Sequence, residues 1–317
     1  MYNADLKNKF LEEGVDSQRT ASNFKYAFER VAKFEEAWGY DICNAQPQDI
    51  QQVIDEVYKG RTLTQESFLS YIRRYTKWCV DNNVSTSSPP SLTGEIEFSP
   101  PESCRETFVS SPLHLKKFLD EILTFSEEQN SVENIYRCLY WLAFSGIKRS
   151  DVMSVKKADV DLHHMAIRFG EYKQEFPIYR ESLDMIVFAV KARSFYYYHP
   201  KYNNVIIRDR IDSEFLISGM KKLDLRQVLA EMSRKNGAAV SEGKTSQRLS
   251  YERIRLSGMF YRIREMEQAG YDIDFIQIVE EEISEEGDSK KVSRKNIMDK
   301  ARDMRRDYDR WKIAYNY

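Results

Sequence analysis

Two adjacent cations follow the glycine that ends an apolar helical pattern. The segment 134–161 reads NIYRCLYWLAFSGIKRSDVMSVKKADVD, and its apolar residues recur at helical spacing up to Gly146. Lys148 and Arg149 then come directly before Ser150, a residue type that often caps the first turn of a helix. The sequence therefore predicts a positive pair held between two helix ends, a place that suits an anion such as a phosphate.

A second basic segment lies between residues 244 and 264, within a chain whose formal net charge is −2. Its cations are Lys244, Arg248, Arg253, Arg255, Arg262 and Arg264. Glu252 is the one acidic residue among them. Such local basicity in a nearly neutral chain indicates an anionic partner for this segment, whereas the whole-chain charge indicates none.

A third set of cations lies on one face of a predicted helix that starts at Thr62 or Thr64 and runs to about Val80. These cations are Arg73, Arg74 and Lys77. Their spacing allows them to follow a phosphate backbone. A solvated surface face is the plain alternative.

The first basic segment resembles a known signature. AFSGIKRSDVMSVKKADVDL is similar to the first box of the tyrosine recombinase (phage integrase) family, approximately T-G-L-R-x-S-E-L-x-x-L-x-x-x-D-I-D. The matching residues are Ser145, Gly146, Ile147, Ser150, Asp151, Val152, Val155, Asp159, Val160 and Asp161. The arginine column holds Lys148, and an arginine follows one place later, at Arg149.

The second basic segment resembles the second box of the same family, H-x-x-R followed by a helix and an A-G-x-D ending. Residues 252–255 and 269–272 align with its two ends. Arg255 is retained, whereas Glu252 stands in the histidine column. The resemblance also implies a DNA-contacting lysine on a hairpin, and Lys173 is the residue at that position.

These changes have a chemical meaning. Phosphoryl transfer to a tyrosine requires donors or cations around the phosphate, and a carboxylate at Glu252 adds repulsion instead. The four histidines, at 114, 163, 164 and 199, leave the C-terminal part without a candidate for either family histidine. The resemblance therefore implies a degenerate recombinase with no catalytic residues.

A tyrosine nucleophile is still conceivable near the C-terminus. Tyr308, Tyr315 and Tyr317 are candidates by location, and Tyr308 has the most basic neighbours. In the alternative interpretation, a C-terminal helix packs these side chains against its own core or that of a neighbouring protomer. Its anchoring residues are Ile297, Met304, Tyr308, Trp311 and Tyr315.

The elements that must position these residues are mainly α-helical, with a small β-hairpin or sheet. We expect a helical core-binding-like domain over 1–84, a Pro/Ser-rich linker over 85–105 and a tyrosine-recombinase-like domain over 106–317. Alternation predicts a hairpin from 165–169 and 176–179, and apolar residues predict a helix over 183–198. The runs VIIRDR and EFLIS are extra strands or loop anchors.

Composition excludes several classes of protein. Cys43, Cys79, Cys104 and Cys138 form no CxxC pair, so we expect free thiols, no metal site and no cofactor. No apolar run approaches the roughly 20 residues of a membrane span, and the N-terminus lacks a signal core. We expect a cytoplasmic protein without a membrane partner.

The resemblance leads to one main expectation and two rivals. The main one is a sequence-specific double-stranded DNA-binding transcriptional repressor that controls prophage lysogeny and is able to self-associate through its C-terminal helix. The rivals are an active recombinase, with Arg149 as first arginine and Tyr308 as nucleophile, and an interaction protein without DNA. The expected DNA-binding residues are Arg73, Arg74, Lys77, Lys148, Arg149, Lys173, Lys244, Arg248, Arg253 and Arg255. The expected vestigial site is Lys148, Lys173, Glu252, Arg255 and Tyr308.

Overall fold

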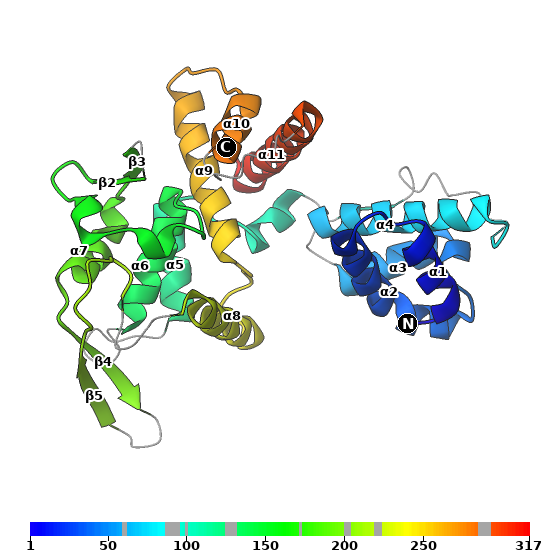
Figure 1. Cartoon of the computed structure of the whole chain (residues 1–317), viewed down its shortest axis with the longest axis horizontal. Helices are drawn as coiled ribbons and strands as arrows, with labels where there is room; N and C mark the ends of the chain where they lie inside the picture. The colour runs from blue at the N-terminus through cyan, green and yellow to red at the C-terminus, as the bar shows by residue number, and fades with distance from the viewer. Residues whose placement is uncertain are drawn as a thin grey trace. The chain divides into compact units, whose positions relative to one another are not determined.

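The chain divides into two compact units, Met1–Cys104 (unit 1) and Arg105–Tyr317 (unit 2). The computed structural model describes residues 1–58, 62–85, 96–98, 101–123, 132–170, 173–199, 204–218, 224–284 and 293–317. Residues 86–95, 99 and 100 of the predicted linker lie outside the described residues. The predicted class, mainly α-helical with small antiparallel sheets, is confirmed (Figure 1).

Unit 1 is a helical domain with an aromatic core. Its helices are α1 (Ala4–Glu13), α2 (Gln18–Trp38), α3 (Pro47–Val57) and α4 (Thr62–Asp81). Phe10 lies edge-on to Phe24 and Tyr75, with ring centroids 4.9 and 5.1 Å apart. The predicted helix end at Gly39, which adopts φ 78°, and the predicted start at Pro47 are both confirmed.

Unit 2 combines helices with two small sheets. Its helices are α5 (Pro112–Ile122), α6 (Val132–Ser145), α7 (Leu183–Lys191), α8 (Leu225–Ser241), α9 (Tyr251–Gln268), α10 (Phe275–Ser284) and α11 (Arg294–Tyr315). The strands are β1 (Val160–Asp161), β2 (Ala166–Phe169), β3 (Gln174–Pro177), β4 (Ser194–His199) and β5 (Asn204–Asp209). The antiparallel sheets have the orders β1-β2-β3 and β4-β5.

The core of unit 2 is built around α6, which is buried along most of its length. Helix α9 crosses it closely at Gly258, whose backbone lies against the carbonyl of Phe144. Arg262, one turn further along α9, donates to the same carbonyl at 2.8 Å. The close crossing fixes the start of α9 relative to the end of α6, the two places from which the candidate site is built.

Replacing Gly258 with alanine is expected to lower the free energy of unfolding by about 3 kcal/mol, because the new Cβ would meet backbone. A Cβ there lies 1.7 Å from the Phe144 oxygen, so the two helices must move apart. Urea unfolding of the full chain measures the change. Gly237→Ala is the matched control, since Gly237 is an exposed α8 residue with open space around it. That variant is expected to gain about 0.5–1 kcal/mol through helix propensity.

Two sequence-based expectations about unit 2 are wrong. The chain does not start a new α-helix at Ser150, but makes a short 3-10 turn over Val152–Ser154. The turn stops because Val155 is extended and its carbonyl accepts from Leu216 at 2.8 Å. The predicted helix over 183–198 ends at Lys191, and SFYYYH instead forms β4, since aromatic residues favour strands.

The remaining fold predictions of unit 2 concern a hairpin and two apolar runs. The predicted hairpin is present as β2 and β3, with the second strand at Gln174–Pro177, two residues earlier than expected. VIIRDR lies in β5, and EFLIS is a loop anchor whose Leu216 and Ile217 are buried. The four cysteines are free and buried. Among the described residues, no helix combines the length and apolar character needed to cross a membrane.

Candidate nucleic-acid interface

The turn after α6 presents Lys148. Gly146 adopts φ 117°, and the amides of Gly146 and Ile147 donate to the carbonyls of Ala143 and Leu142 at 2.8 and 3.0 Å. This pattern is a Schellman motif, which needs the left-handed conformation that glycine adopts most easily. The motif turns the chain away from the core, and the Lys148 side chain is therefore partly exposed to solvent.

The first turn of α9 is fixed beside the same loop. Ser250 caps the helix, its hydroxyl accepting from the amide of Arg253 at 3.3 Å. Tyr251 is buried and donates its hydroxyl to the carbonyl of Ile147 at 3.0 Å. Burial raises the pKa of Tyr251 well above its usual value, so this hydroxyl stays a donor. One hydrogen bond therefore ties the residue before Lys148 to the helix that carries Arg255.

Arg255 and Lys148 converge on one glutamate. Arg255 donates through Nη1 to Glu282 Oε1 at 2.7 Å and through Nε to Glu252 Oε2 at 2.9 Å. Lys148 Nζ donates to the backbone carbonyl of Glu282 at 2.6 Å. Burial alone would lower the pKa of Arg255, but the hydrogen bonds and charges of Glu282 and Glu252 outweigh it and raise that pKa. The result is a partly buried cationic site that holds two carboxylates.

Glu282, in the last turn of α10, was missed by sequence reasoning. Its signal was present in FIQIVEEEIS, where three glutamates follow an apolar pattern. Val279 is 2% exposed, and Glu282 stands one helical turn later on the same face. A carboxylate on the buried face of a helix requires a cation, and Arg255 supplies it.

Tyr308 does not join this site. It is buried in α11, and its hydroxyl donates to Glu267 Oε2 at 2.8 Å. Glu267 follows Arg255 by twelve residues on α9, which corresponds to about 18 Å along a helix axis. Burial and the Glu267 hydrogen bond raise the pKa of Tyr308, which disfavours the tyrosinate.

The C-terminal helix packs against its own unit, as one of the two interpretations of the sequence expected. Trp311 Nε1 donates to Val109 O at 3.0 Å, and Tyr315 Oη donates to Phe108 O at 2.6 Å. Self-association through α11 remains a prediction.

Lys173 and Arg149 are both exposed. Lys173 adopts φ 47° at the tip of the β2–β3 hairpin, where its amide donates to Gly170 O at 3.1 Å. The base of this hairpin is fixed to the end of α6, because Ser145 Oγ donates to Pro177 O at 2.6 Å. The hairpin is thus anchored three residues before Lys148, and within the described residues Lys173 makes no ion pair or hydrogen bond with Arg255.

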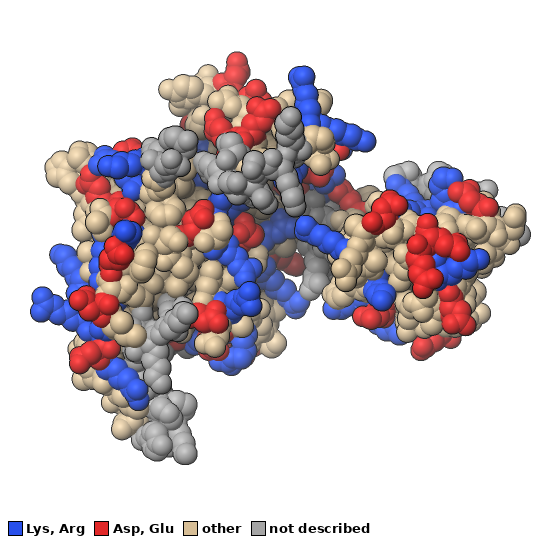
Figure 2. Space-filling view, viewed as in Figure 1, with Lys and Arg blue, Asp and Glu red and all other residues tan. Residues whose placement is uncertain are grey.

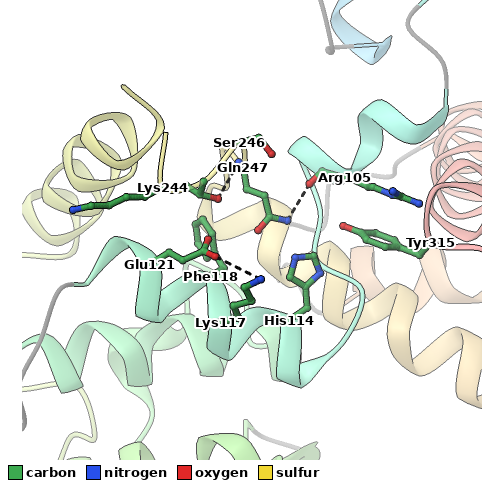
Figure 3. A pocket seen from close by; sticks show the side chains of 10 residues that line it. Arg105, His114, Lys117, Phe118, Glu121, Lys244, Ser246, Gln247 and Tyr315 are labelled. Atoms are coloured by element: carbon green, nitrogen blue, oxygen red, sulfur yellow. Dashed lines mark hydrogen bonds and ion pairs between the residues drawn. The ribbon is translucent and has the colours of Figure 1, made fainter. Parts of the chain in front are cut away.

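Of the remaining predicted cations of unit 2, Lys244 lines a pocket of about 340 Å³, whereas Arg248 and Arg253 do not. Lys244 lies at its edge, pairs with Glu242 at 2.7 Å and points away from His114 (Figure 3). At the centre, Gln247 donates to the carbonyls of Arg105 and Phe108 at 3.0 and 2.9 Å. These bonds fix the loop that leads into α9.

Arg248 and Arg253 lie on either side of that loop and helix start. Arg248 is exposed, and its amide donates to Glu106 O at 2.7 Å. Arg253 faces α11 instead, with its guanidinium 5.0 Å from the Phe108 ring and 4.0 Å from Asp307. Burial raises the pKa of Asp307 to about 6, against the opposing charges of Arg253, Arg306 and Arg310. Arg253 therefore contributes to the packing of α11 rather than to binding an anion from solvent.

The predicted cations of unit 1 lie on α4. Arg74 donates to Gly14 O at 2.5 Å and lies 3.7 Å from Asp16, so it ties α4 to the loop after α1. Lys77 pairs with Asp81 at 2.8 Å. Arg73 is partly buried and makes no ion pair within the described residues. Among the three, Lys77 has the most exposed side chain, at 68%, and is therefore the most accessible to a phosphate.

Charges of both signs are interspersed on the visible surface of each unit. Figure 2 shows Lys and Arg side chains among Asp and Glu, in keeping with the formal net charge of −2. No uniform positive field follows from such a surface. A local cluster is therefore the place to look for anion binding, and Lys148 and Arg255 form one whose side chains are held by hydrogen bonds.

Comparison with known proteins gives one match in sequence and several in structure. Residues 1–81 match the family model described as MrpR, N-terminal core-binding domain. None of the curated proteins matches the chain. Among solved structures, lambda integrase (residues 75–356) bound to DNA has TM-score 0.44 and 9% identity, covering 84% of this chain and 88% of that chain. XerA recombinase has TM-score 0.34 and 13% identity, covering 85% and 86%.

Proposed function

We propose that this chain is a sequence-specific double-stranded DNA-binding transcriptional repressor, built on a tyrosine recombinase scaffold that does not cleave DNA. The observation that carries the proposal is the pairing of Arg255 with Glu252 at 2.9 Å and Glu282 at 2.7 Å. Phosphoryl transfer needs donors and cations around a phosphate that gains negative charge. Two carboxylates oppose that chemistry, while Lys148 and Arg255 remain suited to binding a backbone phosphate.

Two further observations support this proposal. The segments around Lys148 and Arg255 resemble the two signature boxes of the recombinase family, and residues 1–81 match a core-binding-domain model. The pattern of retained scaffold and altered catalytic positions resembles the master lysogeny repressor of SP-beta-like Bacillus prophages. We therefore propose control of prophage genes as the biological role.

The active-recombinase alternative has less support. It requires Tyr308 to attack a phosphate held near Arg255, yet the Tyr308 hydroxyl is bonded to Glu267 at 2.8 Å. Glu267 lies about 18 Å further along α9 than Arg255. The third alternative, an interaction protein without DNA, gives Lys148 and Arg255 only the structural role of holding the end of α10 through Glu282.

Sequencing of DNA that co-purifies with the protein from its host tests the proposal. We expect a small set of enriched sites, affinity for duplexes of these sites that falls steeply as salt rises, and no covalent adduct with a nicked duplex. An adduct that Tyr308→Phe abolishes would establish the recombinase instead. If the protein binds no duplex even at low salt, the remaining alternative is an interaction protein without DNA.

A further inference from the structure

The cationic site of unit 2 is occupied by the end of a helix. Arg255 Nη1 contacts the Glu282 carboxylate at 2.7 Å, and Lys148 Nζ contacts the Glu282 carbonyl at 2.6 Å. Glu282 belongs to the last turn of α10, where backbone carbonyls lack partners within the helix and carry the negative end of its dipole. The two cations thus bind two different negative groups of one residue.

The Glu282 carboxylate resembles a phosphate as a hydrogen-bond acceptor. A carboxylate and a phosphate oxygen both accept charge-assisted hydrogen bonds from a guanidinium, at similar distances. The Arg255 side chain is 12% exposed and the Glu282 side chain 28% exposed, so Glu282 is the outer of the two. An anion that took over the hydrogen bond of Arg255 Nη1 would have to displace the Glu282 carboxylate.

Among the described residues, few apolar side chains of α10 are buried. The helix packs chiefly against α11, through Phe275, whose ring centroid is 5.7 Å from that of Tyr308. Val279 is its only fully buried residue among those described, and Ile276 is 41% exposed. A helix with so little buried apolar surface opens at a small free-energy difference.

We propose that Glu282 is an internal competitor for DNA phosphate at Lys148 and Arg255, so that duplex binding requires the end of α10 to leave the site. The proposal rests on the proposed function and adds its regulation. The affinity for DNA then equals the intrinsic affinity of the open site reduced by the fraction of molecules in which it is open. A change that releases α10 but keeps Lys148 and Arg255 strengthens binding, and a partner that holds α10 in place weakens it.

Glu282→Gln tests the competition, with Glu280→Gln as matched control. Both variants remove one negative charge from α10, but Glu280 is exposed, whereas Glu282 contacts both Lys148 and Arg255. Glu282→Gln is expected to bind duplex about tenfold more tightly than wild type. This is the gain expected if the site is open in about a tenth of wild-type molecules and in most molecules of the variant. The control should change affinity by less than about twofold, the effect of a screened surface charge. Fluorescence anisotropy with one labelled duplex gives both values.

A second measurement needs no variant. Hydrogen exchange of residues 275–284 in the wild-type full chain should become faster when saturating duplex is added, because the last turn of α10 loses its partners. The failures are distinguishable. Wild type that binds no duplex removes the proposed function. If wild type binds duplex, three results would overturn the proposed competition by Glu282 and leave the proposed repressor function intact. These are equal affinities of the two variants, weaker binding by Glu282→Gln, and unchanged exchange in α10.

Discussion

Lys7→Met is expected to lower the free energy of unfolding by about 4 kcal/mol, because it leaves buried carboxylates without their cation. Lys7 and Glu35 are fully buried, and the ammonium donates to both Glu35 oxygens at 2.5 Å. The same ammonium lies 3.6 Å from Asp41. Burial raises the pKa of Glu35 and Lys7 opposes that rise, so without Lys7 the carboxylate must protonate or be exposed to water.

Urea unfolding of the full chain, followed by circular dichroism, measures this loss. Lys9→Met is the matched control, since Lys9 is 58% exposed and lies 4.0 Å from Glu13. It should change stability by less than about 0.5 kcal/mol. Adding Glu35→Gln to Lys7→Met should recover part of the loss, because it removes the unpaired charge. Equal stabilities of the two lysine variants would show that the buried pair contributes little to unit 1.

The helices that could be predicted from the sequence are those whose signals are local. Gly39 ends α2 and Pro47 starts α3 because the required backbone angles are properties of these residues alone. Ser111 caps α5 in the same way, accepting from the amide of His114. Each signal lies within one turn of the feature it determines, so no knowledge of the fold was needed.

The expectations that failed depend on partners distant in sequence. Ser150 resembles a helix cap, yet Val155 pairs with Leu216 and the helix is not formed. Likewise, Ser194–His199 is compatible with a helix by apolar pattern and becomes a strand because Asn204–Asp209 returns beside it. In both cases a long-range backbone pairing decided the local conformation.

The candidate site shows the same division. The sequence resemblance placed Lys148, Glu252 and Arg255 in one site, and the structure joins Glu252 to Arg255 directly and Lys148 to Arg255 through Glu282. The same resemblance placed Tyr308 there by location, but the chain continues past α10 into a helix that buries this tyrosine beside Trp311. A buried lysine such as Lys7 has no local signal either, since its carboxylate partners lie on other elements.

Arg255→Ala is expected to weaken duplex binding by about a hundredfold, more than the loss of one surface phosphate contact. Two effects add. The variant loses a guanidinium that is positioned by Ser250, Tyr251 and the crossing at Gly258, and it leaves Glu252 on the same helix to repel the phosphate. The slope of affinity against salt should fall by about one phosphate contact.

Arg302→Ala is the control for the lost charge, because Arg302 is 75% exposed and pairs with Asp299 on its own helix. Its affinity should stay within about twofold of wild type. Arg255→Lys should lie between the two, since an ammonium keeps the charge but lacks the planar fork that now reaches two carboxylates. Thermal melts of all three variants establish that they are folded. If Arg255→Ala and Arg302→Ala bind alike, then the duplex does not contact this site, and the DNA-binding surface must be sought on the hairpin tip at Lys173 or on α4.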